Sequence, residues 1–258
     1  MGPKVILIFC AFGAELRSLR TLLSDAKPLT GPDLRGFQGR AGGSDAALIA
    51  TGIGVRRAQQ AAALALGHFY STNRIIITGV AGALDATLPI GRVVLADRLM
   101  VRRGNEFAAE TEIEAPRAHR EPFAAALDAA RITFAVGPFL TSRRALARVA
   151  DKRRAYEALG AIAVDMESAV VALESAKRDL PFVCIRTIMD TAVDEIEGAY
   201  LADEDGRVKH LAVAAALMTK PRLVIASMKL MRNLRAATRS MTEAIAAVLR
   251  TNASSRTR

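Results

Sequence analysis

The sequence has few aromatic residues, two cysteines and no long apolar run. Aromatic side chains make up 5% of the 258 residues and tryptophan is absent, so the chain lacks the stacking surfaces on which single-stranded nucleic-acid binders hold bases. Cys10 and Cys184 lie in apolar segments and imply neither a disulfide framework nor a metal motif. No stretch reaches the roughly 18 consecutive apolar residues of a membrane-spanning helix. The apolar N-terminal segment has no signal-peptide cleavage pattern, and we expect a cytoplasmic protein that binds no nucleic acid.

The excess positive charge is confined to the C-terminal fifth of the chain. The formal net charge is +10, and the segment from Gly206 to Arg258 holds 11 of the 36 basic residues but one of the 26 acidic residues, which leaves the rest balanced. This asymmetry indicates an appended basic segment that meets an anionic surface. A solvated basic tail is the alternative.

Apolar strands alternate with helical patterns along the first 200 residues. Strands are predicted over 5–11, 46–51, 75–78, 93–96, 133–140 and 182–188, and helices over 57–67, 121–130, 144–159 and 165–179, with an earlier helix that carries Leu16, Leu19 and Leu22. Such alternation is typical of a sheet covered by helices on both faces. We therefore predict a single-domain, three-layer α/β/α fold with a mixed, mostly parallel sheet over residues 1–219.

Residues 220–258 are predicted to form a basic amphipathic helical extension that ends in a frayed tail. On a helical wheel the cations Arg222, Lys229, Arg232, Arg235 and Arg239 lie opposite the apolar residues Leu223, Val224, Met228, Leu230, Met231, Leu234 and Met241. Helices with this pattern lie in the interface of anionic membranes. An ordinary surface helix that packs its apolar side on the protein body would show the same pattern.

Glycine-rich and acidic segments follow the predicted strands, where an open α/β sheet collects ligands. Residues 13–17, 51–54 and 78–82 qualify, as do residues 165–167 together with 186–190. None of them is a GxGxxG or Walker loop, so dinucleotide and ATP binding lack their sequence motifs.

Taken together, four motifs resemble the nucleoside phosphorylase and nucleosidase superfamily, which includes purine nucleoside phosphorylase, uridine phosphorylase and methylthioadenosine/S-adenosylhomocysteine nucleosidase. The motifs read TGIGVRRAQQAA, IITGVAGALDATLPIGRVVLAD, AIAVDMESAVVA and VCIRTIMDTA, and they cover roughly residues 4–200. The resemblance implies an enzyme that cleaves the N-glycosidic bond of a nucleoside, needs no metal or organic cofactor and forms a homodimer.

The resemblance also assigns roles to residues of these motifs. It implies that Glu167 binds the ribose hydroxyls beside Met166, and that Asp190 protonates N7 of the base, which favours a purine over a pyrimidine. A carboxylate at the sugar stabilises an oxocarbenium-like transition state, and an acid near N7 stabilises the departing base. The other expected substrate contacts are Val80, Ala81 and Gly82.

The N-terminal loop leaves the attacking nucleophile open. Glu15 matches the residue that positions water in the hydrolytic nucleosidases, whereas Gly13 and Arg17 have the spacing of a phosphate site in the phosphorylases. At the family's second phosphate position this chain has Ile77 and Val80, neither of which can hold an oxyanion. We therefore favour water, with inorganic phosphate as the alternative co-substrate.

The basic extension makes the chain most similar to the hopanoid-associated phosphorylases. That resemblance implies cleavage of adenosylhopane, a nucleoside with a pentacyclic lipid on its 5′ carbon, to adenine and ribosylhopane or its 1-phosphate. The C-terminal helix would then attach the enzyme to the inner membrane surface. The alternatives are a soluble methylthioadenosine/S-adenosylhomocysteine nucleosidase and a nucleoside-binding module that has lost catalysis. The presence of Glu15, Glu167 and Asp190 together argues against the second alternative.

Overall fold

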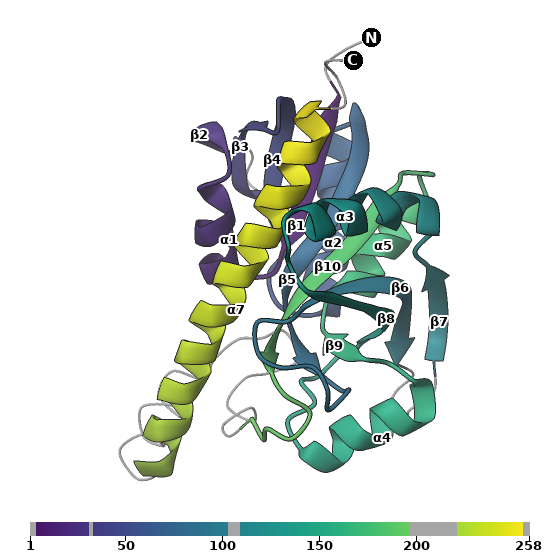
Figure 1. Cartoon of the computed structure of the whole chain (residues 1–258). Helices are drawn as coiled ribbons and strands as arrows, with labels where there is room; N and C mark the ends of the chain where they lie inside the picture. The colour runs from purple at the N-terminus through teal and green to yellow at the C-terminus, as the bar shows by residue number, and fades with distance from the viewer. Residues whose placement is uncertain (1–3, 31–32, 103–108, 197–220, 255–258) are drawn as a thin grey trace.

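A computed structural model describes residues 4–30, 33–102, 109–196 and 221–254, with side chains in the last range described for 227–250 (Figure 1). The strands are β1 (Val5–Cys10), β2 (Ser24–Pro28), β3 (Arg35–Ala41), β4 (Ser44–Ala50), β5 (Thr72–Ala83), β6 (Val93–Arg102), β7 (Ala109–Glu114), β8 (Phe134–Thr141), β9 (Ala163–Asp165) and β10 (Phe182–Asp190). The helices are α1 (Gly13–Arg20), α2 (Val55–His68), α3 (Arg117–Ala129), α4 (Val149–Leu159), α5 (Ser168–Ala176) and α7 (Pro221–Ser254). The predicted α/β class is confirmed.

The strands form one mixed sheet, part of which closes on itself. β1 pairs in parallel with β4 and β5, and β5 pairs in parallel with β10. From β10 the pairings continue through β6, β8 and β9 and return to β5. Gly82 on β5 therefore pairs with both Val164 of β9 and Asp190 of β10. This closure brings the start of α5 next to the end of β10, which positions the candidate site.

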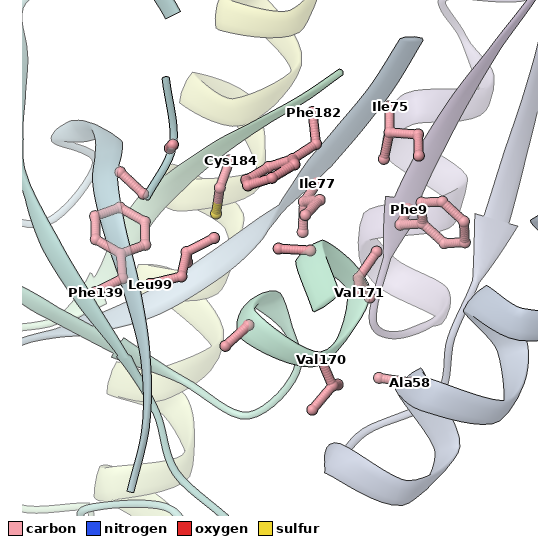
Figure 2. Close-up of a cluster of buried hydrophobic side chains, with 14 of the residues drawn as sticks. Phe9, Ala58, Ile75, Ile77, Leu99, Phe139, Val170, Val171, Phe182 and Cys184 are labelled. Carbon is pink, nitrogen blue, oxygen red and sulfur yellow. The ribbon is translucent and has the colours of Figure 1, made fainter. Parts of the chain in front are cut away.

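Alternate side chains of the central strands face two different helical layers. Leu7 and Phe9 of β1 pack in a cluster with residues of α2 and α5, and Figure 2 shows Phe9 beside Ile77 and Val171 in this cluster. Ile6 and Ile8 point the other way, into a cluster with residues of α1, α3 and α7. Because the central strands are buried on both faces, they read as continuous apolar runs in the sequence.

Several elements differ from the sequence prediction. β2, at the edge of the sheet, and its neighbour β3 consist mostly of exposed and half-buried residues, and β7 alternates half-buried with exposed ones. None of the three contains the apolar run that marks a buried strand. The helix predicted over 144–159 begins later, at Val149. The prediction of a helix over 165–179 was wrong at its start, because β9 ends at Asp165 and α5 begins at Ser168. Asp165 Oδ1 accepts hydrogen bonds from the amides of Glu167 and Ser168, which would otherwise lack partners at the helix start.

The long helix α7 packs on the body through its C-terminal half (Figure 1). Its buried residues Met241, Ala244, Ile245, Val248 and Leu249 join the same cluster as α1 and α3. Met241 therefore packs on the sheet, although the wheel had placed it on a face available to a membrane. This half of the helix follows the alternative interpretation of an ordinary packed helix.

Most side chains described in the other half of α7 are exposed, although Asn233 and Ala237 are buried. Met228 is 69% and Met231 50% exposed. The side chains of Arg222, Leu223 and Val224 lie outside the described residues, as do those of the predicted tail, 251–258. The domain boundary near residue 220 stays a prediction. Within the described residues, no helix has the length and hydropathy needed to cross a membrane.

Candidate active site

A cavity of about 180 Å³ lies where β1, β4, β5, β9 and β10 end. All seven residues predicted to bind or cleave the substrate line it, namely Glu15, Val80, Ala81, Gly82, Met166, Glu167 and Asp190. The two residues predicted for phosphate, Gly13 and Arg17, are exposed and are not among the lining residues. The remaining lining is mostly apolar and includes Phe12, Ile53, Leu146, Met189 and Ile196.

Glu15 is fully buried and is held by three backbone amides. Its Oε2 accepts hydrogen bonds from the amides of Ala11 at 2.7 Å and Phe12 at 3.3 Å, and its Oε1 accepts one from the amide of Val80 at 2.8 Å. Burial raises the pKa of Glu15, while Arg186 and the three amides oppose that rise. A fixed carboxylate with a raised pKa accepts a proton more readily than an ordinary carboxylate does.

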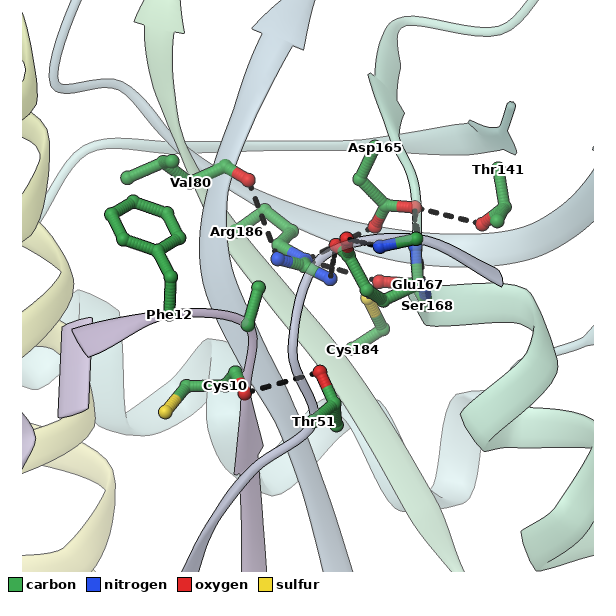
Figure 3. Close-up of polar contacts among 12 residues, drawn as sticks. Cys10, Phe12, Thr51, Val80, Thr141, Asp165, Glu167, Ser168, Cys184 and Arg186 are labelled. Atoms are coloured by element: carbon green, nitrogen blue, oxygen red, sulfur yellow. Dashed lines mark hydrogen bonds and ion pairs between the residues drawn. The ribbon is translucent and has the colours of Figure 1, made fainter. Parts of the chain in front are cut away.

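Glu167 lies in a buried cluster of charges around Arg186 of β10 (Figure 3). Arg186 Nη2 donates to Glu167 Oε2 at 3.4 Å, and Arg186 Nε lies 3.1 Å from Asp165 Oδ2. Glu167 Oε1 accepts a hydrogen bond from the amide of Gly54 at 2.9 Å. Burial raises the pKa of Glu167 to about 7, against the opposing charge of Arg186. The cluster fixes the Glu167 carboxylate at the cavity wall.

Sequence reasoning assigned no role to Arg186 or Asp165. The available signal was a charged residue inside the apolar strand VCIRTIM, because arginine is almost never fully buried unless it is paired. Arg186 also donates through Nη1 to the carbonyl of Val80, so it connects β10 to β5 as well as to the start of α5.

Asp190 forms a buried ion pair with Lys152 of α4. Lys152 Nζ lies 2.5 Å from Asp190 Oδ2, and the two side chains are 1% and 6% exposed. Burial raises the pKa of Asp190, and Lys152 opposes that rise. Lys152 lies within the helix predicted over 144–159, and its sequence position alone assigned it no role. Its spacing from Ala155 and Leu159 on one helix face was the signal that it points inward.

Two glycines on β5 let these charged groups converge. A Cβ at Gly79 would lie 2.3 Å from Arg186 Nη1 and 2.7 Å from Glu15 Oε1, and its φ of +140° also disfavours other residues. A Cβ at Gly82 would lie 2.9 Å from Asp190 Oδ2. A side chain at either position would displace a carboxylate from the cavity.

The arrangement places three carboxyl groups around one apolar cavity. Carboxylates in such positions can bind hydroxyl groups, orient a water molecule and transfer a proton to a leaving group. Within the residues that the structure describes, no group of three His, Cys, Asp or Glu side chains could hold a metal ion. The three carboxyl groups can perform acid–base chemistry on a ligand that carries hydroxyl groups.

Comparisons with known proteins point to the same chemistry. A family model described as Phosphorylase superfamily matches residues 5–220. The chain is similar to a 5′-methylthioadenosine/S-adenosylhomocysteine nucleosidase of Mycobacterium bovis, with 28% identity over 218 residues that cover 72% of this chain and 85% of that protein.

Two crystal structures show the same fold. A nucleosidase of this name from Neisseria meningitidis, in complex with methylthio-immucillin-A, has a TM-score of 0.75 and 18% identity over 96% of this chain and 99% of that chain. An S-adenosylhomocysteine nucleosidase from Streptococcus pyogenes, in complex with 5-methylthiotubericidin, has a TM-score of 0.76 and 22% identity over 97% and 98%.

Proposed function

Because this chain belongs to the phosphorylase superfamily, as its four motifs predicted, we propose that it is a purine nucleosidase of the methylthioadenosine/S-adenosylhomocysteine nucleosidase type. It hydrolyses the N-glycosidic bond between adenine and a 5′-substituted ribose. The observation that carries this proposal is the convergence of Glu15, Glu167 and Asp190 on one cavity. The similarity to named nucleosidases supports the same class of substrate.

Glu167 binds the sugar in this mechanism. The ribose hydroxyls donate hydrogen bonds to its carboxylate, and Met166 lies beside the sugar ring. As the glycosidic bond lengthens, positive charge develops on the ribose, and a fixed carboxylate stabilises that charge without reorganising. Arg186 and the amide of Gly54 hold Glu167 in place for this role.

Asp190 and Glu15 handle the two protons of the hydrolysis. The electrons of the C1′–N9 bond pass to the adenine ring, and protonated Asp190 gives its proton to N7, so the base leaves as neutral adenine. A water molecule attacks C1′ and gives its proton to Glu15. The products are adenine and the free 5′-substituted ribose, and no cofactor takes part.

Water fits the site better than phosphate. Ile77 is buried in the sheet, and the amide of Val80 already donates to Glu15. Gly13 and Arg17, the two residues predicted for phosphate, are exposed and do not line the cavity. A phosphate ion in the cavity would therefore lack these predicted partners and would face the carboxylate of Glu15.

The test is incubation of the purified protein with methylthioadenosine, with and without inorganic phosphate, followed by chromatography of adenine and mass analysis of the sugar. We expect adenine and free methylthioribose at a rate independent of phosphate. A sugar 1-phosphate would overturn the assignment of water. No adenine from methylthioadenosine, S-adenosylhomocysteine or a lipid-linked adenosine would overturn the proposed function.

A lipid-linked substrate is the second candidate, and the exposed half of α7 favours it. Met228 and Met231 are exposed there beside the exposed cations Lys229, Arg232 and Arg235. Such a surface can rest on an anionic membrane, where adenosylhopane would be presented with its adenine end toward the enzyme. The expected products are adenine and ribosylhopane. Homodimer formation, which the family resemblance implies, belongs to the same set of proposals.

A further inference from the structure

We propose, on the basis of the acid role assigned to Asp190, that Lys152 is the positioning residue of the catalytic acid. It fixes one carboxylate oxygen of Asp190 and balances its charge, so that the other oxygen is presented to the leaving base. Lys152 comes from α4, whereas Asp190 ends β10. The two residues are therefore brought together by the fold and not by a local motif.

The contacts of Lys152 leave it no donor for the substrate. Its Nζ donates to Asp190 Oδ2 at 2.5 Å, to the carbonyl of Thr191 at 2.8 Å and to the carbonyl of Asp194 at 2.9 Å. An ammonium group has three N–H donors, and these three acceptors use all of them. Lys152 is also absent from the residues that line the cavity. It can therefore affect the reaction only through Asp190 and the segment that follows it.

The contacts of Asp190 leave one oxygen for the substrate. Oδ2 is taken by Lys152, and Oδ1 accepts no hydrogen bond from the residues that the structure describes. Asp190 nevertheless lines the cavity, and Gly82 of β5 provides the space beside the carboxyl group. A carboxyl group held at one oxygen cannot rotate freely, so the contact with Lys152 restricts the directions in which Oδ1 can meet a ligand.

The positive charge of Lys152 opposes the effect of burial on the pKa of Asp190. The charged groups that face Asp190 are Lys152 on α4 and Asp194 in the segment after β10, while β5 presents Gly82. Burial and Asp194 both raise the pKa of Asp190, and Lys152 lowers it. Without the cation, Asp190 would bind its proton more tightly and would be a poorer donor to N7.

A double-mutant cycle tests whether Lys152 acts through Asp190. Lys152→Met, Asp190→Asn and the double variant are compared with the natural chain in kcat for methylthioadenosine hydrolysis. We expect Lys152→Met to lower kcat by about 10-fold or more, and the double variant to be no slower than Asp190→Asn alone. Losses that multiply in the double variant would show that Lys152 does not act through the acid, and would overturn the proposal.

The pH profile separates positioning from a purely structural role. The limb of the kcat/KM profile that belongs to Asp190 is the one that disappears in Asp190→Asn. In Lys152→Met this limb is expected to move to higher pH by about one unit or more, because an adjacent cation lowers a carboxyl pKa by that amount. Lys177→Met is the matched control. Lys177 Nζ also pairs with a carboxylate, Glu174 Oε1 at 2.6 Å, but neither residue lines the cavity. That variant is expected to leave the limb in place.

Thermal melting establishes that the variants are folded before they are compared. If Lys152→Met does not fold, Lys152→Gln removes the charge but keeps two donors for the carbonyl groups of Thr191 and Asp194, and it should move the same limb. A limb that does not move in a folded variant would overturn the positioning role while leaving the nucleosidase proposal intact. Full activity of Asp190→Asn would overturn the acid role and the positioning role together.

Discussion

At the scale of single residues, the three carboxyl groups proposed to act in the cavity differ in the groups that they contact. Glu15 is held by backbone amides, Glu167 by Arg186 and the amide of Gly54, and Asp190 by Lys152. Groups in different environments can hold different protonation states at one pH. The proposed hydrolysis requires this separation, because a base and an acid must work in the same cavity.

Asp190→Asn is expected to remove cleavage of adenine nucleosides selectively. Asparagine keeps the shape but cannot donate the proton, so kcat for methylthioadenosine should fall by about 100-fold or more. p-Nitrophenyl riboside is the control substrate, since p-nitrophenolate leaves without a proton, and its hydrolysis should fall far less. Equal losses on both substrates would show that Asp190 supports the structure of the cavity and not the departure of the base.

The pKa of Glu167 predicts an acidic limb in the activity profile. Burial raises this pKa from 4.5 to about 7, and only the ionised carboxylate can accept hydrogen bonds from two ribose hydroxyls. The form that binds ribose is therefore present above about pH 7 and is lost as the pH falls below it. kcat/KM measured from pH 5 to 9 should decline below neutrality, and Glu167→Gln should lower kcat and flatten that decline. An effect on KM alone would contradict a role in the transition state.

At the scale of elements, α7 has two halves with different environments. Its C-terminal half packs into the core with α1 and α3, and the side-chain hydroxyl of Thr187 on β10 donates to its Ala237 carbonyl. Its other half presents Met228 and Met231 to solvent. One continuous helix therefore serves both the core and an exposed amphipathic surface.

Met241→Ala is expected to destabilise the fold, because Met241 is 1% exposed and its removal leaves a cavity between α7 and the sheet. A loss of about 2–5 kcal/mol in the free energy of unfolding is typical for such a change. Met228→Ala is the matched control on the same helix, and its 69% exposure predicts a change within about 0.5 kcal/mol. Urea unfolding measures both, and equal losses would contradict the division of the helix.

At the scale of the whole molecule, the distribution of charge predicts reversible attachment to anionic membranes. The described cations Lys229, Arg232 and Arg235 lie on the exposed half of α7, within the segment of the sequence that holds the excess positive charge. Each cation near an anionic leaflet contributes about 1 kcal/mol, and salt screens that attraction.

The double variant Met228→Glu and Met231→Glu tests this attachment without disturbing the core. Truncation of α7 would instead remove the buried residues of its C-terminal half. We expect the natural chain to sediment with liposomes that contain anionic lipid and to be released at high salt, whereas the variant stays in solution and still cleaves methylthioadenosine. Equal sedimentation of both proteins, or of neither, would exclude this surface as the point of attachment.

The sequence by itself determined the α/β class, the buried strands β1, β5 and β10, and seven of the residues that line the cavity. These features are local, because buried strands are continuous apolar runs and the site residues lie in short motifs at strand ends. The edge strand β2 and its neighbour β3 carry no such run, so the sequence did not reveal them.

Only the tertiary structure decided the partners of the carboxyl groups in the candidate site. Arg186 meets Glu167 because β10 lies beside the start of α5, and Asp190 meets Lys152 because this side chain of α4 reaches the end of β10. The same holds for α7, whose amphipathic pattern fits both a membrane surface and the core until the packing of Met241 is known. Contacts between residues distant in the chain depend on how the sheet closes, and no periodicity within a segment encodes that closure.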